Sequence, residues 1–340
     1  MNFKHALVLT LLGFGMAACS PATPDAYLKP KNQEEKVVQD NTQVFDPKVD
    51  ILFVVDNSGS MATHQRNLAT NVAKFTSTFT KSSVLDYNIG VLTTDMDGYS
   101  WGGRKACCGQ LAGNVRVVNK MTPSADQILA ANFVLGTDGA ADEKSFDPVF
   151  AALSPPNLTG WNNGFYRQDA SIAVIFLTDA EDQSENIDAN GLYRFLLNLK
   201  GGNASKVLGY GVLVPSNDTT GCDRDEYRTT PVRIESFLSM VTNHKANIMN
   251  LCDPDYGTRL ANLAKDIVDN VGNIIFLDRP PDVKSIRVTY GAIDLPKDYE
   301  KGWTFDIDKN AIMLGSKIDW SSQPSGSRVK VFYSAAEFKK

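Results

Sequence analysis

The chain has 340 residues, a net charge of −5 and five cysteines. The excess of acidic residues and the absence of any run of lysines and arginines argue against nucleic acid as a partner. No apolar run is long enough for a transmembrane helix, and no internal repeat is visible.

The first 19 residues have the features of a secretion signal. Lys4 supplies a positive charge, and the apolar run 6–14 is too short to span a bilayer. Met16-Ala17-Ala18-Cys19 resembles a bacterial lipobox, although Met16 stands where Leu is usual. The resemblance implies a lipidated Cys19, and Ser20 after it implies passage to the outer membrane. The alternative is an ordinary cleaved signal peptide. Residues 20–40 are rich in Pro, Lys, Glu and Gln, which is typical of a solvated tether.

The other four cysteines agree with export, because an even number in an exported chain indicates disulfides. We expect Cys222–Cys252 to pair across a long loop. The adjacent Cys107 and Cys108 would then form a vicinal bridge or stay reduced. The alternative is a pair of cross-links between the two loops.

Strands and helices alternate between residues 41 and 272, which is typical of a mostly parallel sheet with helices on both faces. The first buried strand is Ile51–Val55, and the helix after it has an apolar stripe at Leu68, Val72, Phe75 and Phe79. The other expected strands are Tyr87–Leu92, Asn114–Val118, Ser171–Leu177, Val207–Val214 and Asn247–Leu251. The other expected helices are Ser124–Phe133 (with Ser124 as its cap), Ser145–Leu153, Val232–Met240 and Thr258–Val271.

The last part of the chain, 273–340, has no helical periodicity. Short β runs separated by Pro, Gly and Asn/Asp turns predict a small all-β module of sandwich type. Its strands are expected at Ile274–Leu277, Ser285–Tyr290, Trp303–Ile307, Ala311–Leu314 and Val329–Tyr333. A module this small needs additional core. We therefore expect the segment before Val49, where a strand is expected at Gln43–Phe45, to pair with it.

A carboxylate and two hydroxyls follow the first buried strand, in Asp56-Asn57-Ser58-Gly59-Ser60. These hard oxygen ligands suit Mg²⁺, Mn²⁺ or Ca²⁺ better than zinc. The string 49–61, with its D-x-S-x-S motif, resembles von Willebrand factor type A (vWA) domains. That resemblance implies a Rossmann-like doubly wound α/β fold and a metal-ion-dependent adhesion site (MIDAS) that begins with Asp56, Ser58 and Ser60.

Two further loops would complete the site that the resemblance implies. Thr178-Asp179 ends the strand 171–177, as in the family, so Asp179 is expected to contact the metal directly or through water. The family often has Gly next, and Ala180 here implies a different local turn. For the second loop we favour Thr137, in a loop with Gly on both sides, over Thr94.

Thr94 and Asp95 would then lie on the rim of the site. The acidic loop 181–188 begins with Glu181 and Asp182, which are further rim candidates. This loop is either a second cation site or a solvated surface loop, and we favour the solvated loop because acidic runs are usually exposed.

These features predict a lipid-anchored, cation-dependent adhesion or receptor protein that binds an Asp or Glu of a protein partner through the metal. An envelope assembly or scaffold factor that uses the same site is the alternative, and a metallohydrolase is a distant third. We expect no enzyme, because no catalytic motif is visible and His64 is expected on the surface.

Overall fold

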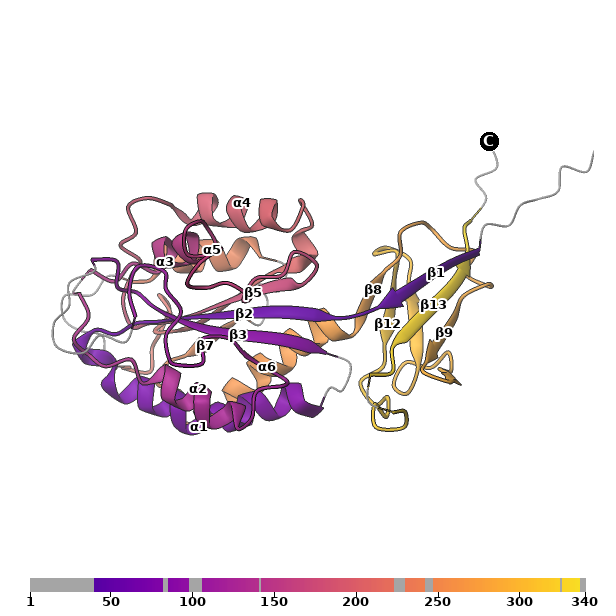
Figure 1. Ribbon diagram of the computed structural model, residues 1–340, viewed down its shortest axis with the longest axis horizontal. Helices are drawn as coiled ribbons and strands as arrows, with labels where there is room; N and C mark the ends of the chain where they lie inside the picture. Colours follow the sequence, from indigo (N-terminus) through magenta and orange to yellow (C-terminus); the bar gives the residue numbers. More distant parts are fainter. Residues whose placement is uncertain are drawn as a thin grey trace, which may run out of the picture. The chain divides into compact units, whose positions relative to one another are not determined.

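The computed structural model of the chain (Figure 1) describes residues 40–81, 85–97, 106–140, 142–222, 230–241, 247–324 and 326–336. The expected signal segment 1–19, the lipidation site Cys19 and all but the last residue of the tether 20–40 lie outside the described residues. Within the described part, no helix is long and apolar enough to cross a bilayer.

A six-stranded sheet forms the centre of the α/β domain. Five strands are parallel, and β4 at one edge is antiparallel to β3. The order across the sheet is β4 (Val118–Asn119), β3 (Asp86–Thr93), β2 (Lys48–Val55), β5 (Ser171–Leu177), β6 (Val207–Leu213) and β7 (Ile248–Asn250). Counted along the chain from β2, this is the order 3-2-1-4-5-6 of doubly wound folds, so the predicted fold class is confirmed.

Helices cover both faces of this sheet (Figure 1). Ile51 and Phe53 of β2 pack against one group of helices, and Leu52 and Val54 pack against the other, because alternate residues of a strand point to opposite faces. The first group is α1 (Ala62–Lys81), α2 (Ala125–Phe133) and α6 (Tyr256–Gly272). The second is α3 (Phe146–Ala152), α4 (Ala189–Leu199) and α5 (Val232–Met240), and a 3-10 turn, η3 (Ala204–Lys206), leads into β6.

The carboxyl ends of the three central strands are in register. Val55, the last residue of β2, pairs with Thr93 of β3 on one side and with Leu177 of β5 on the other. The chain leaves β2 toward β3, and β5 begins the other half of the sheet, so the strand order reverses between β2 and β5. Ligands of open α/β sheets bind outside the carboxyl ends of the strands at such a switch point.

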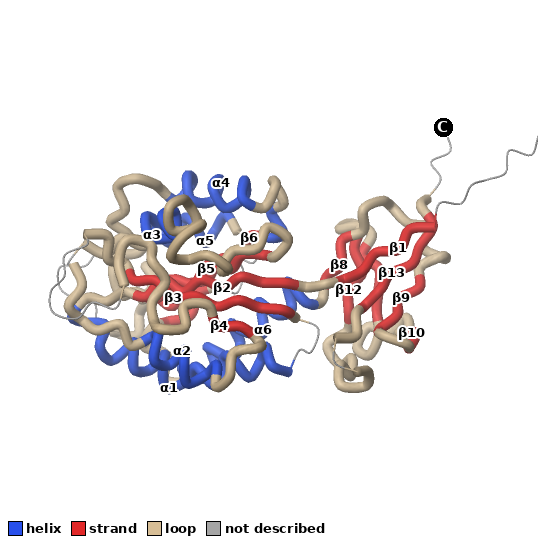
Figure 2. Tube along the Cα trace, viewed as in Figure 1, coloured by secondary structure: helices blue, strands red, loops and turns tan. Residues whose placement is uncertain are grey.

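A small β-sandwich follows the α/β domain, and its described residues form strands, turns and loops without a helix (Figure 2). The predicted pairing with the segment before the α/β domain is present, because β1 (Asp40–Phe45) is antiparallel to β13 along its whole length. The α/β domain is thus inserted between two parts of the sandwich. One sheet is β1, β13 (Val329–Ser334), β9 (Arg287–Tyr290) and β10 (Ile293–Asp294), and the other is β11 (Trp303–Asp306), β12 (Ala311–Leu314) and β8 (Ile274–Phe276).

Some sequence expectations differ from the structure. Only the end of the strand expected at Asn114–Val118 is paired, because the Asn132 side chain donates to Val115 O (3.0 Å) and takes the place of a strand neighbour. Ser124 does not cap α2 through its side chain, since its backbone is left-handed with φ of 49°. Strand β1 begins three residues earlier than expected, and β10 was not expected.

A buried charge cluster fixes the amino end of β2. The carboxylate of Asp50, which is fully buried, accepts hydrogen bonds from Arg167 N (2.6 Å) and Arg167 Nε (2.8 Å). Lys200 Nζ donates to Arg167 O (2.8 Å) and lies 4.0 Å from the centre of the Tyr166 ring. Burial raises the pKa of Asp50 to about 6 and lowers the pKa of Lys200 to about 8.

We predict that the Lys200 cluster makes stability rise in alkaline solution. Between pH 8 and the usual lysine pKa near 10.5, the unfolded chain keeps a proton that the folded chain has lost. The free energy of unfolding should therefore increase with pH across this window, by up to about 3 kcal/mol. Urea unfolding at several pH values should show the rise in the wild type and in Lys206→Met, and a flatter profile in Lys200→Met. Identical profiles for all three proteins would contradict it.

Candidate metal centre

The first loop of the site leaves β2 at Asp56, whose side chain is completely buried. Asp56 Oδ1 accepts a hydrogen bond from Ser58 N (2.7 Å). Ser58 stands at the start of a 3-10 turn, η2 (Gly59–Met61), but its hydroxyl makes no capping bond there and instead lies 3.2 Å from Ser60 Oγ. Capping of this turn therefore does not explain Ser58, and its hydroxyl oxygen is a neighbour of the Ser60 hydroxyl oxygen.

The third loop, after β5, is joined directly to Asp56. Thr178 Oγ1 donates to Asp56 Oδ2 (2.7 Å) and accepts from Ala180 N (3.0 Å). The backbone of Asp56 also donates to Leu177 O (2.9 Å). Asp179 is the next residue of this loop, and it is almost fully buried. Ala180 does not take positive φ, so it forms the turn without the conformation that favours glycine.

The second loop, residues 134–139, runs beside the first. Gly139 N donates to Asn57 O (3.0 Å), and a Cβ at Gly139 would come within 2.6 Å of the Asn57 side chain. Glycine is therefore required at this close approach. Thr137 lies in this loop and is half-buried. The structure thus places the predicted Thr137 next to the first loop, and its contact with a metal stays a prediction.

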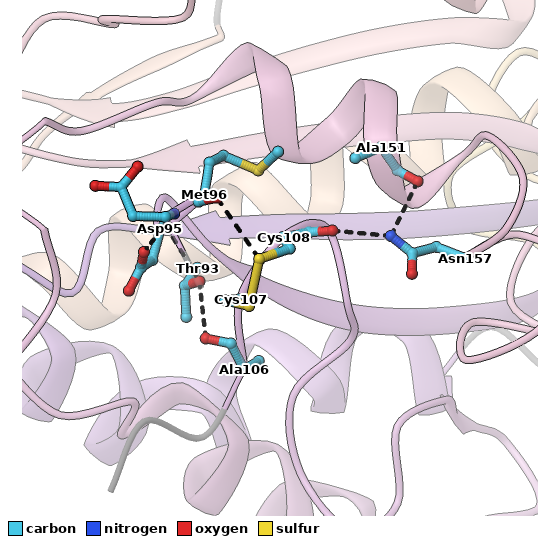
Figure 3. The surroundings of a disulfide bond; sticks show 9 residues. Thr93, Asp95, Met96, Ala106, Cys107, Cys108, Ala151 and Asn157 are labelled. Carbon is cyan, nitrogen blue, oxygen red and sulfur yellow. Dashed lines mark hydrogen bonds between the residues drawn. A yellow bond between two sulfur atoms is a disulfide. The ribbon is translucent and has the colours of Figure 1, made fainter. Parts of the chain in front are cut away.

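Thr94 and Asp95 follow β3 on the other side of Asp56. Thr94 Oγ1 is 3.5 Å from Asn57 Oδ1, and both Thr94 and Asp95 are buried. Of the two states expected for Cys107 and Cys108, the structure has the vicinal disulfide, which lies beside this segment (Figure 3). Cys108 N donates to Asp95 O (2.8 Å), and the Cys108 sulfur faces the carbonyl oxygen of Met96.

The second predicted disulfide, Cys222–Cys252, is also confirmed. It joins the loop after β6 to the loop after β7, again beyond the carboxyl ends of the strands. Neither bridge joins Cys107 or Cys108 to Cys222 or Cys252, so the alternative pair of cross-links between the two loops is wrong.

Glu181 and Asp182, the further rim candidates, are bonded to other parts of the fold, and their place on the rim stays a prediction. Asp182 Oδ1 accepts from Ser145 N (2.8 Å), Phe146 N (3.1 Å) and Ser184 Oγ (2.6 Å), so it caps helix α3 from a distant loop. Its other oxygen pairs with Arg233 at 3.1 Å.

The rest of the acidic loop is also bound to the fold. Glu181 accepts from Arg233 N (3.0 Å), and burial raises the pKa of its carboxyl above the usual value. Asp147 of α3 accepts from Glu185 N (3.2 Å) and Asn186 N (3.1 Å). Asp182 is buried and Glu181 is half-buried, so the expectation of a solvated loop was wrong for its first two members, whereas Glu185, Asn186 and Asp188 are exposed.

Sequence analysis missed two buried polar residues at the site. Gln65 of α1 is hydrogen-bonded to both the first and the second loop. It falls within the apolar stripe that includes Met61 and Leu68, and a polar residue in such a stripe is a signal that could have indicated it. Glu143 is also buried. The backbone N–H of its neighbour Lys144 donates to Thr94 O (3.2 Å), and Gln183 N donates to Glu143 O (2.8 Å). No local pattern in the sequence indicates Glu143.

The donor atoms fit a hard divalent cation. The oxygens of Asp56, Ser58 and Ser60 and the Asp179 carboxylate lie on two adjacent strand ends, and none of them is a His or Cys ligand of the kind zinc prefers. Within the described ranges, no three His, Cys, Asp or Glu side chains gather closely enough to hold a metal alone. A cation at this place would therefore take hydroxyl ligands together with the two carboxylates.

No protein-family model and no curated protein matches the chain. Solved structures that align with it include proximal thread matrix protein 1 from the mussel byssus (11% identity over 70% of this chain and 51% of that chain, TM-score 0.41). Others are the pilus adhesin SpaC from Lactobacillus rhamnosus GG (15%, 86% and 39%, TM-score 0.39) and a von Willebrand factor type A protein from Catenulispora acidiphila (12%, 88% and 62%, TM-score 0.36).

The mussel protein has also been solved with zinc in its MIDAS motif. The present chain spans about half the length of the mussel protein and less than half of the adhesin. Because these TM-scores are below 0.5, the fold class of this chain is argued from its own strand order, and the candidate site is argued from its own residues.

We predict that Asp182→Ala destabilises the fold without weakening cation binding. Loss of the carboxylate leaves Ser145 N without its acceptor, leaves Phe146 N with Ser184 Oγ alone, and removes the ion pair with Arg233, which should lower the free energy of unfolding by about 3 to 5 kcal/mol. The control is Glu185→Ala in the same loop, where the exposed carboxylate should contribute less than about 1 kcal/mol. Urea unfolding and Mg²⁺ titration of both variants test it. Wild-type stability with weakened Mg²⁺ binding in Asp182→Ala would contradict this prediction and would support a place for Asp182 on the rim of the site.

Proposed function

We propose that this chain is a vWA-type protein-binding module in which a divalent cation, with Mg²⁺ as the first choice, is held by Asp56, Ser58, Ser60, Thr137 and Asp179. The observation that carries the proposal is the hydrogen bond from Thr178 Oγ1 to Asp56 Oδ2 (2.7 Å). It joins the ends of β2 and β5 at the place where the strand order reverses, which is where open α/β sheets bind their ligands.

The chemistry of the ligands favours binding over catalysis. Serine and threonine oxygens are neutral ligands, and the carboxylates of Asp56 and Asp179 together balance the charge of one divalent cation. A bound Mg²⁺ would keep its preference for octahedral oxygen coordination and supply an open position for an outside oxygen. An Asp or Glu carboxylate of a protein partner is the ligand that completes such a set. The residues of the chain hold the cation, and Thr178 and the Ser58 backbone orient the Asp56 carboxylate.

The proposal includes an anchor and a location. Cys19 would carry the lipid, and the outer membrane would hold the protein through it, so that the cation site faces a partner outside the cytoplasm. The two disulfides support an exported chain, because such bonds persist in oxidising compartments. An adhesin or receptor would face the cell surface, whereas an assembly or scaffold factor would face the periplasm.

We predict that Asp56→Ala abolishes divalent-cation binding while the domain stays folded. The variant removes a carboxylate that accepts hydrogen bonds from both the first loop, through Ser58 N, and the third loop, through Thr178 Oγ1. Calorimetric titration with Mg²⁺ and Mn²⁺ should show binding in the wild type and none in the variant. Asp255→Ala is the matched control, because Asp255 lies at the start of α6 and its side chain makes no capping bond.

The outcome that rejects the site is unchanged cation affinity in a folded Asp56 variant. If Asp56→Ala does not fold, Asp56→Asn keeps the shape of the side chain and is titrated in the same way. A pull-down from envelope extracts in Mg²⁺ and in EDTA then tests the partner. A true partner should be released by EDTA and should not bind the Asp56 variant.

Protease accessibility in intact cells separates the two binding roles. An adhesion or receptor protein should be cleaved by protease added outside the cells, because its folded part lies on the surface. Full protection in intact cells, with cleavage after the outer membrane is opened, would support the periplasmic scaffold instead. Turnover of an ester or phosphoester substrate in Mn²⁺ but not in EDTA would favour the metallohydrolase.

A further inference from the structure

The side chain of Gln65 uses its amide to join two loops of the proposed metal centre. It lies on α1 and is only 2% exposed. Gln65 Nε2 donates to Asp56 O (2.9 Å) and to Gly136 O (2.9 Å), and Gln65 Oε1 accepts from Leu135 N (3.0 Å). Both amide hydrogens and one acceptor position are therefore in use.

The three partners belong to the backbone of two separate loops. Asp56 O is in the loop after β2, and Leu135 and Gly136 are in the loop after α2, 70 and 71 residues after Gln65 in the chain. Because Asp56 O and Gly136 O share one donor atom, these two carbonyl groups are held side by side. Gly136 has φ of 92°, so the loop turns sharply where it meets Gln65.

Thr137 lies between two attachment points of the second loop. On its amino-terminal side, Gln65 holds Leu135 and Gly136. On its carboxyl-terminal side, Gly139 N donates to Asn57 O (3.0 Å). The partner at this second attachment, Asn57, belongs to the first loop. At the first attachment, the Gln65 side chain is hydrogen-bonded to both loops.

We propose that Gln65 is a positioning residue that sets the cation affinity of the site by fixing the Thr137 loop against the Asp56 loop. Gln65 does not contact the cation in this proposal. It acts through the backbone of Asp56 and Gly136, and so through the position of the Thr137 hydroxyl. The inference rests on the proposed cation site, and it adds that the second loop is set by helix α1 rather than by the metal.

The test compares Mn²⁺ and Mg²⁺ titrations of full-length Gln65→Met, Thr137→Val and the double variant. Met fills nearly the same volume as Gln but can make none of the three hydrogen bonds. Groups that orient metal ligands typically change affinity by about 10- to 100-fold, so Gln65→Met should bind at least about tenfold more weakly. If Gln65 acts through Thr137, the double variant should bind no more weakly than the weaker single variant.

The matched control is Asn162→Leu. Asn162 is equally buried and also makes three hydrogen bonds to backbone groups, from Leu111 N (2.9 Å) and to Gly109 O (2.7 Å) and Ala152 O (3.1 Å), but none to the two site loops. It should lose stability as Gln65→Met does and keep cation affinity within about twofold. If Gln65→Met does not fold, Gln65→Glu keeps the acceptor for Leu135 N and is measured in its place.

Wild-type affinity in Gln65→Met, equal losses in Asn162→Leu, or additive losses in the double variant would each overturn the inference. These failures are separate from failure of the site itself. If Asp56→Ala still binds the cation, the proposed function is wrong, whereas an intact Asp56 effect with a silent Gln65 variant rejects only the role of Gln65.

Discussion

The parallel pairing of β2 with β5 is the constraint on which the site depends. The pairing carries Val55 and Leu177 to the same level, so the next residues of both strands meet. Asp56 then receives the Thr178 hydroxyl at 2.7 Å and donates its own N–H to Leu177 O at 2.9 Å. A carboxylate that is fully buried at this point is stabilised only if its oxygens are satisfied, and the strand pairing supplies the groups that do so.

Buried polar groups near the carboxyl ends of the strands fall into two sets with different roles. One set, formed by Asp56, Ser58 and Thr178, joins the first and third loops of the proposed site. The other set, which includes Asp182 and Asp147, holds loop 181–188 on α3. Each set contains a buried carboxylate whose oxygens accept hydrogen bonds, so residue type and burial alone do not separate a proposed ligand from a structural cap. The places of the partners in the fold separate them: those of Asp56 lie at the ends of β2 and β5, and those of Asp182 lie at the start of α3.

Much of the fold could be predicted from the sequence because the local patterns are strong. Ser171–Leu177 is a continuous apolar run and α1 has an apolar stripe of helical period, and both elements are present. Asp56 and Asp179 could be placed because they are the first and the second residue after such buried strands. The role of Asp182 could not be predicted, since its partners Ser145 and Phe146 lie 37 and 36 residues away in the chain. The same holds for Gln65, whose partner Gly136 is 71 residues away.

The sandwich shows the same limit in another form. Its short strands could be predicted from β runs and turns, but their order depends on long-range pairing such as Asp40 with Ser334. Strand β10, with only two residues, is too short to leave a pattern. The pairing of β1 with β13 means that the α/β domain begins and ends next to one folded unit, so its two chain ends are both held by the sandwich.

The most direct test of the central claim is to locate a cation by anomalous diffraction from crystals grown in Mn²⁺. The account predicts one strong anomalous peak within coordination distance of oxygens of Asp56, Ser58 and Ser60, with Asp179 bound directly or through a water. A fully ordered site without such a peak at a saturating Mn²⁺ concentration, or a peak held by other residues, would contradict it.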